Sequence, residues 1–271
     1  MLIKRVATVA VLLPLFLGGL FHLPPLAWGY VLLLMLGAGA YEWGRLIGFS
    51  CRAALAYSAA AAGAGLAWLN GPGGAPSVAA TGLWLLATAF WALLVPLWLW
   101  RGWRLGSPAL GMATGLLVLF PAWLALVVLQ PRPWLLLALM GVVWVADSAA
   151  YFAGHRWGRR KLAPSISPGK TWEGVAGAAA GVALYHAAVW HWGLAHQMPG
   201  AGAEMALLVV ALVPLSILGD LFESLMKRQA GVKDSGTLLP GHGGVLDRID
   251  ALTSTLPLAA LAVGLMGLRT G

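Results

Sequence analysis

Four residues between positions 220 and 227 carry groups that could bind a phosphorylated ligand or its metal ion. If this stretch is helical, Asp220, Glu223, Ser224 and Lys227 share one face, because helix neighbours recur three and four positions apart. That face would present two carboxylates, a hydroxyl and an ammonium group. Asp220 still belongs to an apolar run, so we expect it at membrane depth. For Glu223 and Lys227 we favour an ordinary helix-end salt bridge.

A glycine-rich stretch follows at residues 233–250 and ends in two more carboxylates. Its glycines permit tight turns and a close approach of backbone N–H groups to an anion, and Asp247 and Asp250 lie one helical turn apart. Hard Mg²⁺ prefers one or two carboxylates together with water and phosphate oxygens. The residues that would balance the remaining phosphate charge are Lys227, Arg228, Lys233 and Arg248. Ordinary helix capping is the alternative interpretation of this loop.

A third polar segment begins with Asp147, which lies inside an apolar run. An ionisable residue there costs at least about 2.5 kcal/mol on insertion scales, so it usually faces a polar cavity; pairing with a loop arginine is the alternative. Ser167 and Lys170 belong to a Ser-Pro-Gly-Lys turn that would enter a helix and present N–H groups, a hydroxyl and a cation to phosphate. The turn is no P-loop, because Pro164 stands where the first glycine is required. A capped helix start is its simpler interpretation.

Composition indicates which elements position these groups. The chain has 271 residues, of which 60% are hydrophobic and 10% charged, so it is too apolar for one soluble core. A helix needs roughly 17–25 apolar residues to cross a bilayer. Such stretches lie near 6–21, 26–41, 53–69, 80–100, 108–129, 133–153, 174–194, 205–222 and 249–268. The predicted fold class is all-α, a polytopic integral membrane protein with about nine transmembrane helices.

The basic residues predict how the chain is oriented. With nine spans, nearly all Lys and Arg residues fall on one side, and only Arg132 and Arg269 fall on the other. Cytoplasmic loops keep positive charge, so the N-terminus and the polar segments are predicted to be cytoplasmic and the C-terminus outside. The net charge of +8 lies in short loops beside spans, where anionic lipids and phosphates, not nucleic acid, are the expected partners.

We therefore divide the chain into an N-terminal region of about five spans (1–132) and a catalytic region of about four spans (133–271). The cytoplasmic loops of the catalytic region are 154–173 and 223–248.

The polar segments resemble the signature of the phosphatidate cytidylyltransferase family, also called CDP-diglyceride synthetases. The matching run is Ser224-x-x-Lys227-Arg228, Lys233-Asp234, Pro240-Gly241-His242-Gly243-Gly244 and Asp247-Arg248-x-Asp250. Residues 147–154 and 167–174 also resemble upstream segments of the family, with Gly169 where a second lysine is common. The resemblance covers roughly residues 140–255 directly.

The resemblance implies a nine-helix membrane enzyme that joins phosphatidate to CTP, releasing pyrophosphate and forming CDP-diacylglycerol. It also implies Mg²⁺, alone or with a second cation, contact with membrane lipids, and often a homodimer. A compact chain of this kind suggests the inner membrane of a bacterium.

With the chemistry above, the resemblance assigns a role to each candidate residue. The catalytic residues are Asp220, Asp247, Lys227 and Arg248, and the metal ligands are Asp220, Asp247, Asp250 and Asp147. The substrate-binding residues are Ser167, Lys170, Ser224, Arg228, Lys233, Asp234, His242, Gly243 and Gly244. A phosphate monoester is largely dianionic at pH 7, since its second pKa is about 6. The nucleophile therefore needs no general base, and His242 is expected only to donate a hydrogen bond.

Two other classes of protein are compatible with the residues alone. Another lipid phosphotransferase, such as a CTP-dependent lipid kinase, would use the same phosphate and metal groups; a CDP-alcohol phosphotransferase is disfavoured because its Asp-Gly-x-x-Ala-Arg run is absent. An anion transporter could also place acids at membrane depth, but it should show two halves of related hydropathy. No such repeat is visible.

Overall fold

The computed structural model describes residues 2–71, 77–194 and 201–267, and most of them are helical. The first helices are α1 (Leu2–His22), α2 (Pro25–Leu46), α3 (Cys51–Asn70) and α4 (Val78–Ala89), which continues through a π-helical turn, η1 (Phe90–Leu94), into α5 (Val95–Arg101). The later ones are α6 (Pro108–Leu129), α7 (Pro133–Trp157), α8 (Trp172–Val189) with its π-helical turn η2 (Trp190–Leu194), α10 (Gly202–Gln229) and α11 (Leu246–Leu265). The predicted all-α class is confirmed, and every predicted span overlaps one of these helical runs.

Length and apolar composition identify membrane-crossing helices within the described residues. Five helical runs meet both criteria, namely Val78–Arg101, Pro108–Leu129, Pro133–Trp157, Gly202–Gln229 and Leu246–Leu265. Large apolar side chains are exposed on the outside of the bundle, among them Leu34, Leu93, Leu184 and Leu207, as expected where lipid is the solvent. The chain is an integral membrane protein, and the count of nine spans stays a prediction.

Several helices begin where the sequence provides a cap or a proline. The hydroxyls of Ser50, Ser77, Ser107 and Thr171 each accept a hydrogen bond from the backbone N–H three residues later, which satisfies one of the free donors of a first turn. Proline occupies the first helical position of α2, α6 and α7, where its missing N–H costs nothing. These local signals explain why the predicted and observed helix starts agree closely.

A short hairpin replaces the predicted turn between α7 and α8. Strand β1 (Lys161–Ala163) pairs antiparallel with β2 (Ser167–Thr171), with Lys161 opposite Thr171 and Ala163 opposite Ser167. The predicted Ser-Pro-Gly-Lys turn is therefore wrong as a turn, because Ser167, Gly169 and Lys170 lie in β2. A hairpin with a three-residue strand carries too little period-two pattern to be predicted, and an edge strand tolerates Pro168.

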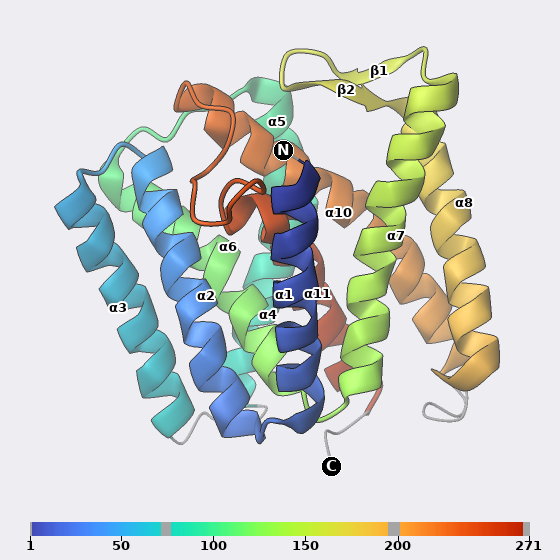
Figure 1. Ribbon diagram of the computed structural model, residues 1–271, viewed down its shortest axis with the longest axis horizontal. Coiled ribbons are helices and arrows are strands. Elements are labelled where there is room, and N and C mark those ends of the chain that lie inside the picture. Colours follow the sequence, from blue (N-terminus) through green and yellow to red (C-terminus); the bar gives the residue numbers. More distant parts are fainter. Residues whose placement is uncertain (1, 72–76, 195–200, 268–271) are drawn as a thin grey trace.

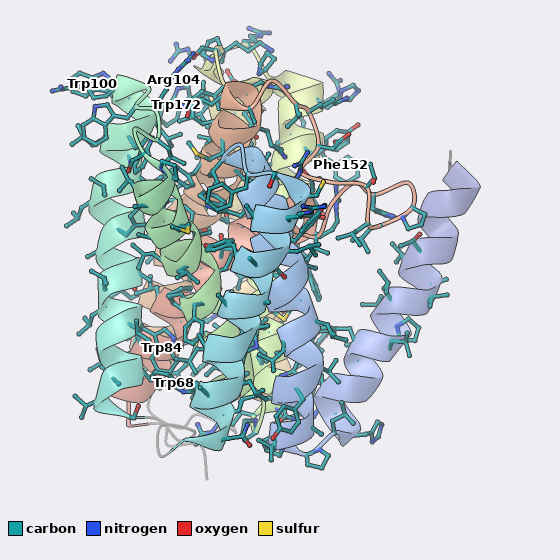
Figure 2. All side chains as sticks on the ribbon, turned by 90° about the vertical axis from the view of Figure 1, so that its left-hand side faces the viewer. Trp68, Trp84, Trp100, Arg104, Phe152 and Trp172 are labelled. Carbon is teal, nitrogen blue, oxygen red and sulfur yellow. The ribbon has the colours of Figure 1, made fainter. Side chains whose placement is uncertain are left out.

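The ends of the bundle differ in charge. Figure 1 shows the first turn of α1, the hairpin and the loop between α10 and α11 at one end, while α11 runs away from that end. In Figure 2 Arg104, Trp100 and Trp172 lie near that same end, and both tryptophans are more than half exposed. Exposed tryptophans and basic residues are typical of a membrane–water interface.

Helices α7 and α8 pack against each other through small residues. A Cβ added to Gly177 would lie 2.2 Å from the Cβ of Ala153, and one on Gly181 would lie 2.6 Å from the Cβ of Ala149. Only small side chains allow two helices in a membrane to approach this closely. The α7–α8 pair and its hairpin therefore form one tightly packed unit.

Helix α10 is held from the other side by aromatic rings. Phe222 is 1% exposed and contacts Trp43 of α2, Phe90 and Trp91 of the π-helical turn, and Trp98 of α5, with ring centroids 5.5–6.2 Å apart. Such pairs stabilise beyond their buried area, by about 0.5–1.5 kcal/mol each. This cluster fixes the rotation of α10 at the level of Asp220 and Ser224.

Candidate active site

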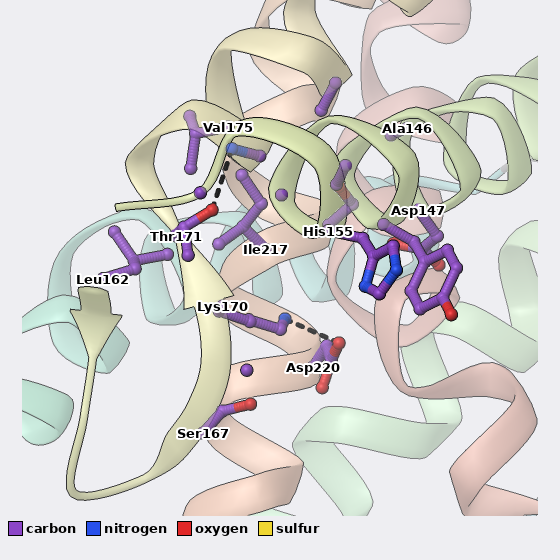
Figure 3. Close-up of a pocket in the computed structure, with 18 of the residues that line it drawn as sticks. Ala146, Asp147, His155, Leu162, Ser167, Lys170, Thr171, Val175, Ile217 and Asp220 are labelled. Atoms are coloured by element: carbon purple, nitrogen blue, oxygen red, sulfur yellow. Dashed lines mark hydrogen bonds and ion pairs between the residues drawn. The ribbon is translucent and has the colours of Figure 1, made fainter. Parts of the chain in front are cut away.

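One cavity of about 730 Å³ lies between the α7–α8 unit and helices α10 and α11. Seven predicted site residues line it: Asp147, Ser167, Lys170, Asp220, Asp247, Arg248 and Asp250. Figure 3 shows Asp147 from α7, Lys170 from β2 and Asp220 from α10 approaching this space from three elements. The remaining walls are mostly small or apolar, with Ala150, Val175 and Ile217 among them. The cavity thus combines acids, cations and an apolar surface.

Lys170 forms an ion pair on the open side of the cavity. Its Nζ lies 2.5 Å from Oδ2 of Asp220, and the two side chains are 23% and 32% exposed. The other oxygen of Asp220 accepts a hydrogen bond of 3.2 Å from the Ser224 hydroxyl, one helical turn away. The hairpin therefore reaches across the cavity to α10 through one charged contact.

Lys227 forms a more buried set of ion pairs. Its Nζ lies 2.7 Å from Oε2 of Glu223 and 2.6 Å from Oδ1 of Asp247, and all three side chains are at most 12% exposed. The predicted helix-end salt bridge exists, and it continues to α11. Lys227 therefore joins the two helices that carry the acidic residues.

The loop before α11 is wrapped around the other oxygen of Asp247. Oδ2 accepts hydrogen bonds from the backbone N–H of Ser235 at 2.9 Å and of Gly244 at 2.8 Å, and from the Ser235 hydroxyl at 3.1 Å. A Cβ on Gly243, whose φ is +81°, would lie 2.6 Å from this oxygen, so the glycine allows a close approach. Of the two predicted anion-binding glycines, Gly244 thus donates its amide to a carboxylate of the protein, and Gly243 lies against the same oxygen.

The carboxylate oxygens of the cavity are chemically suited to a divalent cation, but they do not form a complete coordination shell. Within the described ranges no three His, Cys, Asp or Glu side chains are grouped to hold a metal. Asp147, Asp220 and Asp250 nevertheless line the same cavity. Hard oxygen ligands of this kind suit Mg²⁺, which usually keeps water and substrate phosphate oxygens in its shell and needs few protein ligands.

Comparisons with known proteins identify the family of the chain. The model of the cytidylyltransferase family matches residues 3–266. The chain belongs to the cytidylyltransferase family. It is 44% identical over 274 residues to the phosphatidate cytidylyltransferase of Pseudomonas aeruginosa, a match that covers 96% of each protein.

Shorter matches link the chain to further bacterial relatives. The phosphatidate cytidylyltransferase of Haemophilus influenzae is 51% identical over 125 residues, covering 45% of this chain and 43% of that protein. The one of Bacillus subtilis is 47% identical over 116 residues, covering 43% and 42%.

The predicted site residues that do not line the cavity divide into two groups. Ser224, Lys227, Gly243 and Gly244 do not line the cavity, but they contact the acids that do. In the described part of the chain, Arg228, Lys233, Asp234 and His242 are absent from the cavity wall. Arg228 donates only a long hydrogen bond of 3.5 Å to Val232 O, and Nδ1 of His242 is buried without a partner. Substrate contacts of these four residues stay predictions.

Residues absent from the predicted site also belong to it. Tyr151 and His155 line the cavity one and two turns after Asp147, and their rings stack with centroids 5.9 Å apart. Their spacing of four and eight residues from the acid on a helix is a usable signal. Glu42 is a second omission, because the predicted span ended at residue 41 whereas α2 continues to Leu46. A lone acid buried in an apolar helix should have been a candidate.

Proposed function

We propose that the chain transfers the cytidylyl group of CTP to phosphatidate, forming CDP-diacylglycerol and releasing pyrophosphate. The observation that carries the proposal is the single cavity in which four carboxylates from three helices meet Lys170 and Arg248. Membership of the cytidylyltransferase family and the names of its bacterial relatives support the same substrates.

The reaction we propose is an in-line displacement. A phosphate oxygen of phosphatidate attacks the α-phosphorus of CTP, a new P–O bond forms, and the bond to the β-phosphate breaks with its electron pair leaving on pyrophosphate. The attacking phosphate is already largely dianionic, so the protein has to position two anions and neutralise their charge.

Asp220 and Asp247 would hold Mg²⁺, with Asp250 and Asp147 in support. When bound, the ion supplies charge neutralisation for the phosphate oxygens of the substrate. Asp220 and Asp247 each bind a lysine ammonium through one oxygen. We propose that Lys170 exchanges Asp220 for phosphate oxygens when the substrates bind, whereas Lys227 holds Asp247 in place. Arg248, which lines the cavity, would bind phosphate bidentately.

The apolar part of the cavity suits the lipid substrate. Ala150, Val175 and Ile217 line it beside the acids, so the glycerol end of a lipid can lie on apolar side chains while its phosphate faces the charges. We place the cavity at the cytoplasmic face of a bacterial inner membrane, with the C-terminus outside. The basic residues near the hairpin and the bacterial relatives support this orientation. A homodimer and bound membrane lipids belong to the same proposal.

Labelled CTP tests the reaction directly. Purified protein in phosphatidate-containing vesicles with Mg²⁺ should move label from the α-phosphorus of CTP to lipid, and label from the γ-phosphorus to pyrophosphate. Transfer of γ-label to lipid would indicate a lipid kinase instead. Nucleotide-dependent flux without any lipid product would indicate a transporter.

The metal assignment has its own test in Asp247→Asn. This variant should abolish transfer of α-label while inserting and folding normally, and near wild-type turnover would refute the assignment of Asp247. Glu204→Gln is the matched control, because Glu204 is an exposed acid in the first turn of α10 and does not line the cavity.

A further inference from the structure

The first turn of α11 is capped by a residue from the other half of the chain. Val245 at its N-cap position provides no side-chain acceptor. The backbone N–H groups of Val245 and Leu246 instead donate to the two carboxylate oxygens of Glu42, at 3.0 and 2.9 Å. Glu42 lies on α2, about two hundred positions earlier in the chain. It satisfies free donors that a local Ser, Thr or Asp usually satisfies.

The loop between α10 and α11 is folded closely around this carboxylate. Glu42 is 1% exposed, and the Ser235 hydroxyl donates a third hydrogen bond of 2.9 Å to it. A Cβ on Gly236 would lie 2.5 Å from one oxygen of Glu42, and a Cβ on Gly244 would lie 2.4 Å from the other. A buried carboxylate is tolerated when donors of this kind satisfy it, and the positive end of α11 adds a favourable field.

Ser235 connects Glu42 to the active site. Its hydroxyl lies 2.9 Å from Oε2 of Glu42 and 3.1 Å from Oδ2 of Asp247, and one hydroxyl proton can serve only one acceptor at a time. The amide of Gly244 donates to Asp247 while the next two amides donate to Glu42. The same short stretch of backbone is therefore held by two carboxylates, of which one faces the cavity.

We infer that Glu42 is a positioning residue of the transferase. Its carboxylate, fixed in α2, holds loop 231–245 and the first turn of α11 in the orientation in which Asp247 and Asp250 face the cavity. The role in catalysis rests on the proposed function, whereas the hold on the loop does not. If Glu42 only stabilised the fold, its replacement would lower stability but leave the Mg²⁺ affinity and the kcat of the folded molecules unchanged.

Glu42→Gln tests this inference with little change in shape. The amide keeps one acceptor oxygen and places a donor against the amide or hydroxyl donors of the loop. We expect kcat per folded molecule to fall about 10–100-fold and the Mg²⁺ concentration for half-maximal activity to rise, as for other residues that orient metal ligands. We also expect faster hydrogen exchange at the amides of residues 244–246, which is measured without substrate or metal.

Gln130→Leu is the matched control. Gln130 is 5% exposed, and its Nε2 donates to the carbonyls of Leu20 and Leu23 at 3.1 and 3.0 Å, so it ties helices together away from the cavity. This variant should lower the melting temperature but leave kcat, Mg²⁺ half-saturation and exchange at residues 244–246 unchanged.

The outcomes separate the two roles and the two proposals. If folded Glu42→Gln keeps wild-type kcat and Mg²⁺ half-saturation, the inference is overturned. If Glu42→Gln does not fold, Ser235→Ala decides, because it removes the hydroxyl between the two carboxylates; unchanged Mg²⁺ half-saturation in that variant overturns the inference. If the wild-type protein transfers no label from CTP, the proposed function fails, and exchange at residues 244–246 alone reports on the hold that Glu42 has on the loop.

Discussion

Lys227 and Lys170 each neutralise carboxylates at the cavity, but their surroundings differ. Lys227 is 12% exposed and lies between two acids that are 6% and 5% exposed. Lys170 and its partner Asp220 are 23% and 32% exposed. The first set joins α10 to α11 within the packed part of the bundle, whereas the second joins a two-stranded hairpin to α10 across open space.

This difference separates stability from substrate binding. Removing one partner from a buried ion pair leaves an unpaired charge and costs about 3–5 kcal/mol. A solvated pair contributes only about 0–1 kcal/mol. The Lys227 side of the cavity should therefore behave as part of the fold, and the Lys170 side as a surface that can rearrange around its substrates.

The largest effect is expected for Lys227→Met. The substitution leaves Glu223 and Asp247 close together and buried without their cation, so the free energy of unfolding should fall by about 3–5 kcal/mol. Denaturant unfolding in detergent, followed by circular dichroism, measures the change. If the free energy of unfolding falls by less than about 1 kcal/mol, Lys227 and its two acids contribute no more than an exposed ion pair. The proposed difference between the Lys227 and Lys170 sides of the cavity would then be wrong.

Gly244→Ala should have the next largest effect. Its Cβ would lie 2.1 Å from the Ser235 hydroxyl and 2.4 Å from Glu42, and forcing extra atoms into a packed site typically costs about 1–3 kcal/mol. Both unfolding free energy and transferase activity should fall.

The matched variant on the open side is Gly169→Ala. Among the described residues, no atom lies within 4 Å of a Cβ added to Gly169, so the unfolding free energy should stay at its wild-type value. Equal losses in the two alanine variants would show that the hairpin is as tightly packed as the loop.

Lys170→Gln should change stability little but binding strongly. The unfolding free energy should move by less than about 1 kcal/mol. If Lys170 binds phosphate in the complex, kcat/KM should fall about 10–100-fold, because a hydrogen bond to a charged group contributes about 1.5–3 kcal/mol. Steady-state kinetics with CTP measures this, and Arg104→Gln, at an exposed basic residue that does not line the cavity, is the control. Unchanged kinetics would contradict the proposed exchange of Asp220 for phosphate.

The smallest effect concerns the base of the hairpin. Glu173 accepts hydrogen bonds from the backbone N–H groups of Arg159 and Arg160 at 3.1–3.2 Å. Bonds from backbone N–H groups, first its own and then those of Arg159 and Arg160, lower the pKa of Glu173 below its usual value. The stabilisation is thus present above the ordinary glutamate pKa of about 4.3 and is lost as pH falls below it.

Hydrogen exchange at the Arg159 and Arg160 amides measures this effect. Relative to Glu173→Gln at each pH, the wild-type protein should protect these amides above the glutamate range and lose that protection in acid. Equal exchange in both proteins at neutral pH would show that the carboxylate does not hold the hairpin.

Local patterns predicted the helices and one face of the site. The apolar stretches of the sequence predicted where every helical run lies. The spacing of Asp220, Ser224 and Lys227 predicted that they share one helix face, and in the structure the Ser224 hydroxyl donates to Asp220. Asp147 lines a cavity, as its position inside an apolar run indicated. These features depend on helical period and hydropathy, and both can be recognised within a short stretch of sequence.

The tertiary contacts could not be predicted in the same way. Nothing local indicates that Glu42 caps α11, that Lys227 reaches Asp247, or that Lys170 meets Asp220, because each contact depends on how separate helices pack. The glycine-rich loop is predicted to bind a ligand anion, and four amides of this loop and the first turn of α11 donate to two carboxylates of the chain itself. A sequence shows which residues are charged, but it does not show which of them pair in the folded chain.

The aromatic cluster around Phe222 has a consequence for how a lipid enters. With rings from α2, the π-helical turn and α5 packed on one side, α10 cannot rotate to widen the cavity without separating them. The glycine and alanine contacts between α7 and α8 make those two helices move together. Admission of a two-chain lipid should therefore displace α7, α8 and the hairpin as one rigid body. Spin labels at the exposed positions Leu184 and Leu207 would report that displacement as a broadened distance distribution.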